Sequence, residues 1–324
     1  MPPPSYRIPE SLTPKPGDFS FDLDETLRSV VSMSATVPSD AFTAEVLGTE
    51  RGGHGVLIRE RGVVLTIGYL ITEAETIWLS TNDGRVVGGT VLGYDQETGF
   101  GLVQALGKLE IPAMPLGHSS AAELGTRVVA GGSGGRAHSV AARIASRQEF
   151  AGYWEYVLPD ALYTTPAHPF WGGTALIGPA GDLLGIGSLQ LQHGRDDGSN
   201  VPLNMYVPID ALKPILEDLL TLGRPNRPPR PWLGLYATEI DESIVIAGIA
   251  GKGPAAKAKI RTGDIVLAVA GKKVGALAEL FRGIWRQGDA GVDIPLTILR
   301  DGEVMDLIIA SGDRDRYLKS PSLH

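Results

Sequence analysis

The sequence between residues 27 and 207 is divided into about a dozen short apolar segments separated by turn-forming residues, a spacing typical of strands. This pattern constrains the fold more than any other feature, because such short segments cannot form long helices. Asn82-Asp83-Gly84, between two of these segments, is typical of a tight hairpin turn that needs positive φ. The 42 glycines and 23 prolines also favour many turns. We therefore expect a mainly β chain that begins with two small antiparallel barrels.

The N-terminal residues 1–26 carry repeated prolines, which block regular structure. They predict an extended arm, and Phe19 and Phe21 near its end are candidates to dock on the body of the protein or on a neighbouring subunit. A partly ordered tail that makes only minor contacts is the alternative.

The segment from Asp210 to Gly223 predicts a helix, with the aspartate as its N-cap and the glycine as its end. Residues 223–231 then form a basic, proline-rich linker, the clearest domain boundary in the chain. A second domain follows over residues 232–312, with an amphipathic helix and a hairpin that turns at an Asp-Gly pair. The polar tail, residues 313–324, is expected to fray.

Charge and composition exclude several classes of function. The net charge of −8 is spread along the chain, which argues against nucleic-acid binding. The absence of cysteine excludes disulfides, thiolate zinc sites and cysteine nucleophiles. The longest apolar runs are too short for membrane insertion. Since the first residues also lack the pattern of a secretory signal, we expect a cytoplasmic protein, or a periplasmic one if a signal has been removed.

Several phrases of the sequence match one known family in their order along the chain. These are GVVLTIGYLI, STNDGRVVGGTVLGYDQETG, IPAMPLGHSS, a Trp-Gly-Gly turn, YVPID and GPAAKAKIRTGDIVLAVAGKKV. From about Leu27 to Ser311 the chain resembles the HtrA (Deg) type of trypsin-like serine protease. The resemblance implies a trypsin-like double β-barrel over residues 27–222 and a PDZ domain over residues 232–312.

The resemblance also locates the catalytic positions, and each carries a substitution. The family's histidine, aspartate and serine correspond to Tyr69, Gly99 and Trp171. A tyrosine is a poor base at neutral pH, glycine has no side chain to orient an imidazole, and an indole has no nucleophilic oxygen. One oxyanion-hole position is Pro169, which has no N–H. The sequence therefore predicts that the triad chemistry is lost.

Other residues could in principle supply catalysis or bind a metal. His168 with Thr165, and His54 with Ser133 in the glycine-rich segment 131–135, are conceivable nucleophile–base pairs, although no spacing indicates a nucleophile elbow. The six histidines show no metal-ligand spacing, so we expect neither a metal nor another cofactor.

The second domain has features of an intact peptide-binding site. In the related PDZ domains, an apolar-Gly-apolar segment holds the terminal carboxylate of a peptide that adds as a strand. Trp232, Leu233, Gly234 and Leu235 match that segment. The facing helix would contribute the side-chain pocket, with the residues Leu280, Phe281 and Ile284. The alternative is that both elements only form the core of a small domain.

These observations lead to two main hypotheses. The preferred one is a catalytically inactive HtrA-like homologue that binds peptide or protein C-termini, or assembles as a homotrimer or with active relatives. The alternative is a serine-type endopeptidase in protein quality control that uses a non-standard site. A folded remnant without a ligand is the third possibility.

Overall fold

The computed structural model describes residues 7–194 and 198–319. These residues divide into two compact units. The barrel unit contains the described residues up to 148 and residues 160–226, and the second unit contains residues 149–159 and 227–319. The domain boundaries predicted from the sequence do not assign residues 149–159 to the second unit, because this segment lies far from residues 232–312 in the sequence.

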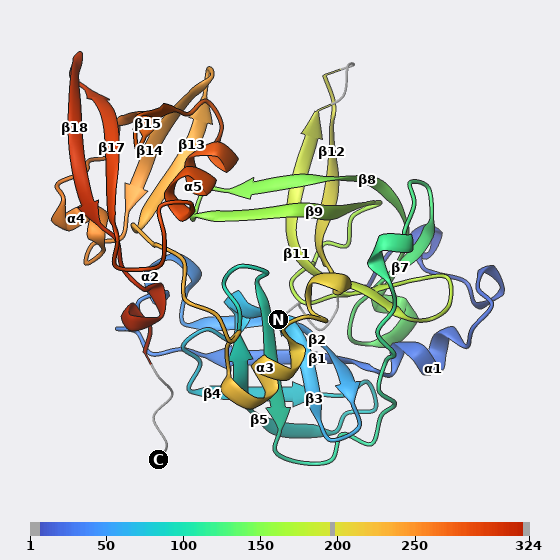
Figure 1. The fold of residues 1–324 in the computed structure, drawn as a ribbon. Helices are drawn as coiled ribbons and strands as arrows, with labels where there is room; N and C mark the ends of the chain where they lie inside the picture. The colour runs from blue at the N-terminus through green and yellow to red at the C-terminus, as the bar shows by residue number, and fades with distance from the viewer. Residues whose placement is uncertain (1–6, 195–197, 320–324) are drawn as a thin grey trace. The chain divides into compact units, whose positions relative to one another are not determined.

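The barrel unit consists of two closed six-stranded antiparallel barrels, as the strand pattern predicts (Figure 1). The first barrel has the order β1-β2-β3-β6-β5-β4, with the bounds β1 Val30–Thr36, β2 Glu50–Arg59, β3 Val63–Ile67, β4 Thr76–Ser80, β5 Val86–Tyr94 and β6 Phe100–Ala105. The second has the order β10-β11-β12-β9-β8-β7, with the bounds β7 Arg127–Gly131, β8 Val140–Gly152, β9 Tyr156–Thr165, β10 Ala175–Ile177, β11 Leu183–Gly194 and β12 Asn200–Pro208. The turn predicted at Asn82-Asp83-Gly84 joins β4 to β5, with φ of +88° at Gly84. Closed barrels leave no unpaired strand edge.

The helices of the barrel unit are short and lie at the barrel ends or in connections. They are η1 Glu10–Leu12, η2 Pro16–Asp18, α1 Leu23–Leu27, α2 Ala44–Leu47, η3 Gly68–Leu70, η4 Ser119–Ala121, η5 Gly135–His138, η6 Ile209–Ala211 and α3 Leu216–Leu222. Within the described residues, no helix has both the length and the apolar character that a membrane span requires.

The N-terminal arm is not simply extended, because it contains η1, η2 and α1. Its first six residues lie outside the described part of the chain. Ile8 packs in the apolar core of the second barrel. Phe21 lies against Gly181, where a Cβ atom on the glycine would meet the phenyl ring at 2.8 Å. The arm therefore docks on the body of its own chain, one of the two partners predicted for it.

The helix predicted from Asp210 begins later than expected. The chain forms η6 at Ile209–Ala211 and becomes α-helical only at Leu216, because Pro214 disfavours the helical conformation of the residue before it. The predicted end is correct, since Gly223 terminates α3 in the left-handed conformation.

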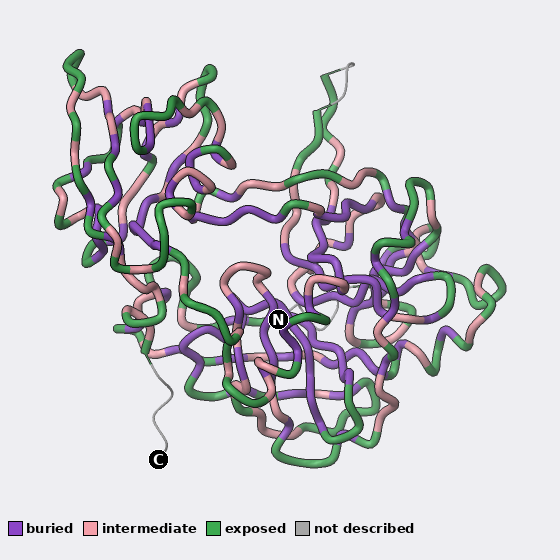
Figure 2. Tube along the Cα trace, viewed as in Figure 1, coloured by how far each residue is buried: buried purple, intermediate pink, exposed green. Residues whose placement is uncertain are grey.

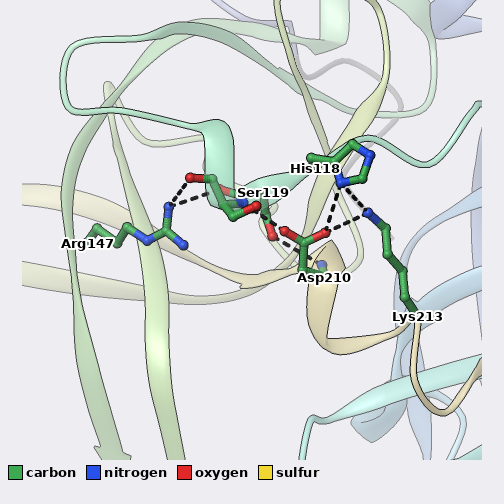
Figure 3. A network of polar contacts seen from close by, with 6 residues as sticks. His118, Ser119, Arg147, Asp210 and Lys213 are labelled. Carbon is green, nitrogen blue, oxygen red and sulfur yellow. Dashed lines mark hydrogen bonds and ion pairs between the residues drawn. The ribbon is translucent and has the colours of Figure 1, made fainter.

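The Asp210 side chain is part of a polar network rather than a helix cap (Figure 3). It accepts a hydrogen bond of 2.6 Å from Lys213 Nζ and one of 2.8 Å from the backbone N–H of Ser120. Burial opposes ionisation of Asp210, but these donors outweigh it and lower the pKa of the carboxyl group. Arg147 joins the network through the carbonyl of Ser119, at 3.0 Å. The network thereby links β8, which carries Arg147, to the segment of Ser119 and Ser120.

The second unit is a small sheet with the strand order β13-β14-β15-β17-β18, and β16 pairs with β15. The bounds are β13 Leu235–Ile240, β14 Ser243–Ile249, α4 Pro254–Lys257, β15 Ile265–Val269, β16 Lys272–Lys273, α5 Leu277–Trp285, β17 Asp293–Arg300, β18 Glu303–Ala310 and η7 Arg314–Tyr317. Figure 2 shows buried residues along many of the strands of each unit and exposed residues at many of the turns.

The segment after residue 312 does not fray where it is described. It forms η7, and the ring of Tyr317 packs on Trp232 with a centroid distance of 4.8 Å. The aromatic contact, which a count of polar residues cannot reveal, explains why the prediction of a frayed tail is wrong for residues 313–319.

Candidate functional site

The fold brings the three predicted triad positions together, beginning with Tyr69 in the turn after β3. Arg51 holds this turn by donating a hydrogen bond of 2.8 Å to the Tyr69 carbonyl. The Tyr69 hydroxyl donates to the carbonyl of Ser188 at 2.9 Å and also contacts the Trp171 side chain. Burial raises the pKa of Tyr69, only partly offset by the contact with Trp171. The phenol is therefore neutral at physiological pH and has its proton committed to a backbone carbonyl.

Gly99 lies directly beside this turn. Its carbonyl accepts a hydrogen bond of 2.6 Å from the backbone N–H of Gly68, the residue before Tyr69. Gly99 has φ of +84°, a backbone conformation that residues other than glycine rarely adopt. Gly99 thus contributes only backbone beside Tyr69, and no carboxylate extends from this position.

Trp171 occupies the bend of the nucleophile-like loop. Its carbonyl accepts hydrogen bonds from Thr174, from the N–H at 3.1 Å and from the hydroxyl at 2.9 Å. Gly173 follows with φ of +79°, and an added Cβ atom would lie 1.9 Å from the carbonyl oxygen of His54. The backbone of the Gly-Gly turn is therefore tightly packed, and the residue before the two glycines carries an indole side chain.

The residues before Trp171 are held by buried polar groups. The backbone N–H of His168 donates to Asn204 Oδ1 at 2.5 Å, and Asn204 returns a bond of 3.0 Å to the His168 carbonyl. His168 Nδ1 accepts from the N–H of Phe170 at 3.1 Å, while Nε2 contacts the His138 carbonyl at 2.8 Å. Both ring nitrogens of His168 are thus engaged with backbone groups and not with Thr165. Pro169, between them, offers no N–H.

His54 and Ser133 are in contact, as one of the conceivable pairs required. Ser133 Oγ lies 3.0 Å from His54 Nδ1, and the Ser133 N–H donates to the same nitrogen at 3.1 Å. Nδ1 therefore accepts, and Nε2 carries the proton that is donated to the Phe170 carbonyl at 3.1 Å. Burial, with a smaller effect of nearby His168, lowers the pKa of His54 to about 3. A base with so low a pKa hardly takes a proton from serine at neutral pH.

In the second unit, the backbone N–H groups of three successive residues converge on one carboxylate. Leu233 donates to both oxygens of Glu155 at 3.2 and 3.1 Å, Gly234 donates at 2.6 Å and Leu235 at 2.8 Å. Gly234 has φ of +77°, which turns its N–H toward the same point as its neighbours. Trp232 anchors the segment through paired backbone hydrogen bonds with Gly312, each of 2.9 Å. The geometry is that of a carboxylate-binding loop.

The three predicted pocket residues lie on α5 and are fully buried. Leu280, Phe281 and Ile284 have no exposed surface and belong to the apolar core of the second unit. The same core contains Val157, from the segment that carries Glu155, with 5 % of its surface exposed.

The sequence analysis missed Glu155. It lies within the segment Tyr153–Tyr156, which has no recognisable motif, and it is separated from the carboxylate-binding loop by more than seventy residues. Burial raises the pKa of Glu155 to about 7, although the three N–H donors and the charge of Arg314 act in the opposite direction. One signal was available, a charged residue in an otherwise aromatic turn, but it did not indicate a partner.

Comparison with known proteins agrees with this architecture. Residues 53–186 match the trypsin-like peptidase domain and residues 231–310 match the PDZ domain. A probable periplasmic serine endoprotease DegP-like of Halomonas elongata is 28 % identical over 274 residues, which cover 81 % of this chain and 56 % of that protein. The solved HtrA-type protease AlgW with decapeptide superposes with a TM-score of 0.53 at 20 % identity and covers 93 % of this chain and 98 % of that chain. The chain therefore combines a trypsin-like peptidase domain with a PDZ domain and is similar to serine proteases of the HtrA (Deg) type.

Two further proteins of known sequence or structure are similar to most of this chain. A probable periplasmic serine protease do/HhoA-like of Haemophilus influenzae is 26 % identical, covering 79 % of this chain and 57 % of that protein. The serine endoprotease from Yersinia pestis has a TM-score of 0.51 at 22 % identity, with 89 % of this chain and 95 % of that chain covered. The chain spans little more than half the length of the curated relatives that it matches.

The names of these relatives contradict the expected location. The similar HtrA proteins are named periplasmic endoproteases, whereas the sequence analysis favoured the cytoplasm. That prediction depended on the pattern of the first residues and on the short apolar runs. The prediction of a cytoplasmic location is therefore wrong.

Proposed function

We propose that this HtrA-type chain is a catalytically inactive protease homologue. The proposal is supported by the substitutions at three adjacent positions, Tyr69, Gly99 and Trp171, which leave neither a base nor an acid to orient it nor a nucleophile. Pro169 removes a further oxyanion donor, and the loss of one such donor costs about 10²–10³ in rate. All four features would have to be compensated in an active enzyme.

We further propose that its activity is the binding of peptides with a free C-terminal carboxylate. The observation that carries this proposal is the convergence of the N–H groups of Leu233, Gly234 and Leu235 on a single carboxylate. Backbone donors of this kind hold a terminal carboxylate in PDZ domains and are independent of the ligand's side chains. Assembly as a homotrimer or with active relatives is a secondary proposal, which sedimentation velocity of the full chain tests.

One observation favours the alternative of a non-standard endopeptidase, namely the 3.0 Å contact between Ser133 Oγ and His54 Nδ1. Two features oppose it. The pKa of His54 is lowered to about 3 by burial, and the Ser133 N–H already donates to the nitrogen that would have to accept the serine proton. The proximity therefore supports a structural role for this pair.

Incubation with unfolded casein and labelling with a serine-directed fluorophosphonate probe test the first proposal. We expect neither cleavage nor labelling of the wild-type chain, and the same result for Trp171→Ala and Ser133→Ala. An active trypsin-like protease serves as the positive control. Cleavage that persists after repurification and disappears in Ser133→Ala would establish the alternative site and refute inactivity.

A further inference from the structure

The edge strand of the second unit's sheet, β13, forms hydrogen bonds with the β8–β9 turn. β13 pairs with β14 on one side only, and such an edge is where an added strand pairs. On its other side the N–H of Ala237 donates to the carbonyl of Tyr153 at 2.9 Å. The N–H of Leu235, two residues earlier, donates to the carboxylate of Glu155, two residues after Tyr153. The two segments thus contact each other at alternate residues in antiparallel register, the spacing of strand addition.

The side chain of Glu155 takes the place that a chain terminus would occupy. Glu155 lies in the turn between β8 and β9, with φ of +59°, so its backbone bends away into β9 while its carboxylate remains in the loop. Only 6 % of the residue is exposed. A side-chain carboxylate in this position presents the same two oxygens to the N–H donors as the last residue of a peptide does.

Apolar and ionic contacts strengthen the same engagement. Val157 packs in the apolar core of the second unit, and the ring of Tyr153 lies 6.0 Å from that of Tyr236 on β13. Glu149, at the other end of the segment, forms an ion pair with Arg282 on α5. The segment 149–159 therefore contributes a carboxylate, a backbone acceptor, an apolar side chain and an ion pair to one site.

We propose that residues 149–159 are a built-in ligand of the PDZ domain, in which Glu155 substitutes for a peptide's terminal carboxylate, and that external C-terminal peptides bind only by displacing it. This inference rests on the proposed peptide-binding function and adds its regulation. Because Val157 belongs to the same apolar core as Leu233 and Leu235 of the loop, we expect the displacing peptides to end in a small aliphatic residue.

Competition of this kind reduces apparent affinity by a calculable factor. A peptide's apparent Kd equals its intrinsic Kd divided by the fraction of molecules in which the loop is free. If the loop is occupied nine-tenths of the time or more, removal of the internal carboxylate lowers the apparent Kd by about tenfold or more. The apparent Kd falls in this way although the contacts between the peptide and the PDZ domain stay the same.

The test measures binding of a fluorescein-labelled decapeptide that ends in Tyr-Trp-Val with a free carboxylate, by fluorescence anisotropy on the full chain at pH 8. We expect Glu155→Ala to lower the Kd at least tenfold. Glu303→Ala, which removes an exposed glutamate on β18, is the matched control and leaves the Kd unchanged. The same peptide with a C-terminal amide binds no variant tightly. We expect a similar gain for Glu155→Gln, which conserves the shape of the side chain. This variant replaces Glu155→Ala if the alanine variant is unstable.

Amide hydrogen exchange provides a second readout that does not depend on any added peptide. The N–H groups of Leu233, Gly234 and Leu235 are protected in the wild type, and we expect that protection to fall in Glu155→Gln while the strand amides of β15 stay protected. Equal peptide affinity for the wild type and both Glu155 variants would overturn the built-in ligand but leave the proposed function intact. Failure of the peptide to bind any variant would overturn the proposed function itself.

Discussion

At the scale of single residues, burial of neutral histidines dominates the region beside Phe170 and Trp171. His54 is 1 % exposed and His168 is 2 % exposed, and their rings meet edge to face at a centroid distance of 5.7 Å. Burial lowers the pKa of both rings. Each ring accepts a hydrogen bond from a backbone N–H, a role that only the neutral imidazole can fill.

This burial predicts acid sensitivity of the barrel unit. The pKa of His54 is about 3 in the folded chain and about 6.5 when unfolded, so the unfolded state binds the proton first. The contribution of His54 to stability is therefore present above pH 6.5 and is lost progressively as the pH falls toward 3. Between pH 7 and pH 5 the loss amounts to about 2 kcal/mol.

Calorimetry of the wild type and of His54→Gln at pH 7 and pH 5 measures this contribution. The barrel transition of the wild type should shift to lower temperature at pH 5, and the variant should show a smaller shift. Part of the shift persists in the variant, because burial also lowers the pKa of His168. An identical shift in both proteins would refute the assignment.

At the scale of elements, a buried ion pair joins β17 to the turn before β15. Arg300 donates to both oxygens of Asp264, at 2.7 and 2.6 Å, and the Asp264 residue is 2 % exposed. The N–H of Arg261 donates to the same carboxylate at 2.8 Å. Burial raises the pKa of Asp264, but the hydrogen bonds and positive charges of Arg300 and Arg261 together outweigh this effect, and the pKa is lowered overall.

Removal of only one partner should therefore be costly. Arg300→Met leaves the Asp264 carboxylate buried without its cation, and we expect a loss of about 3 kcal/mol in the stability of the second unit. Urea denaturation followed by the far-UV signal tests this expectation. The double variant Arg300→Met/Asp264→Asn should recover part of the loss, since no uncompensated charge remains. A loss below 0.5 kcal/mol, roughly the level of an ordinary surface change, would contradict the argument.

Elements also show where prediction from sequence succeeds and fails. The β4–β5 hairpin follows from the Asn-Asp-Gly turn, and the end of α3 follows from Gly223, because both depend on local backbone conformation. The start of the helix was misplaced because Pro214 disfavours the helical conformation of the residue before it. Glu155 was missed for a different reason, because its hydrogen-bond partners are distant in sequence.

At the scale of the whole molecule, the division into two compact units predicts how mutational effects combine. His54 belongs to the barrel unit and Arg300 to the second unit, and neither residue shares a hydrogen-bond partner with the other. Effects of sites without shared partners usually add within about 0.5 kcal/mol. The double variant His54→Gln/Arg300→Met should therefore lose the sum of the two single losses. Calorimetry that shows a deviation above about 1 kcal/mol would reveal coupling between the units.

The class of fold and the order of the two domains could be predicted from the amino-acid sequence alone. These follow from strand spacing, turn residues and motif order, which are local properties of the chain. The loss of the catalytic residues at Tyr69, Gly99 and Trp171 stays a prediction. The contact of His54 with Ser133, and the place of the Glu155 carboxylate in the loop of Leu233–Leu235, follow only from the three-dimensional structure. Such contacts depend on how distant segments pack, and no periodicity of side chains along the sequence specifies them.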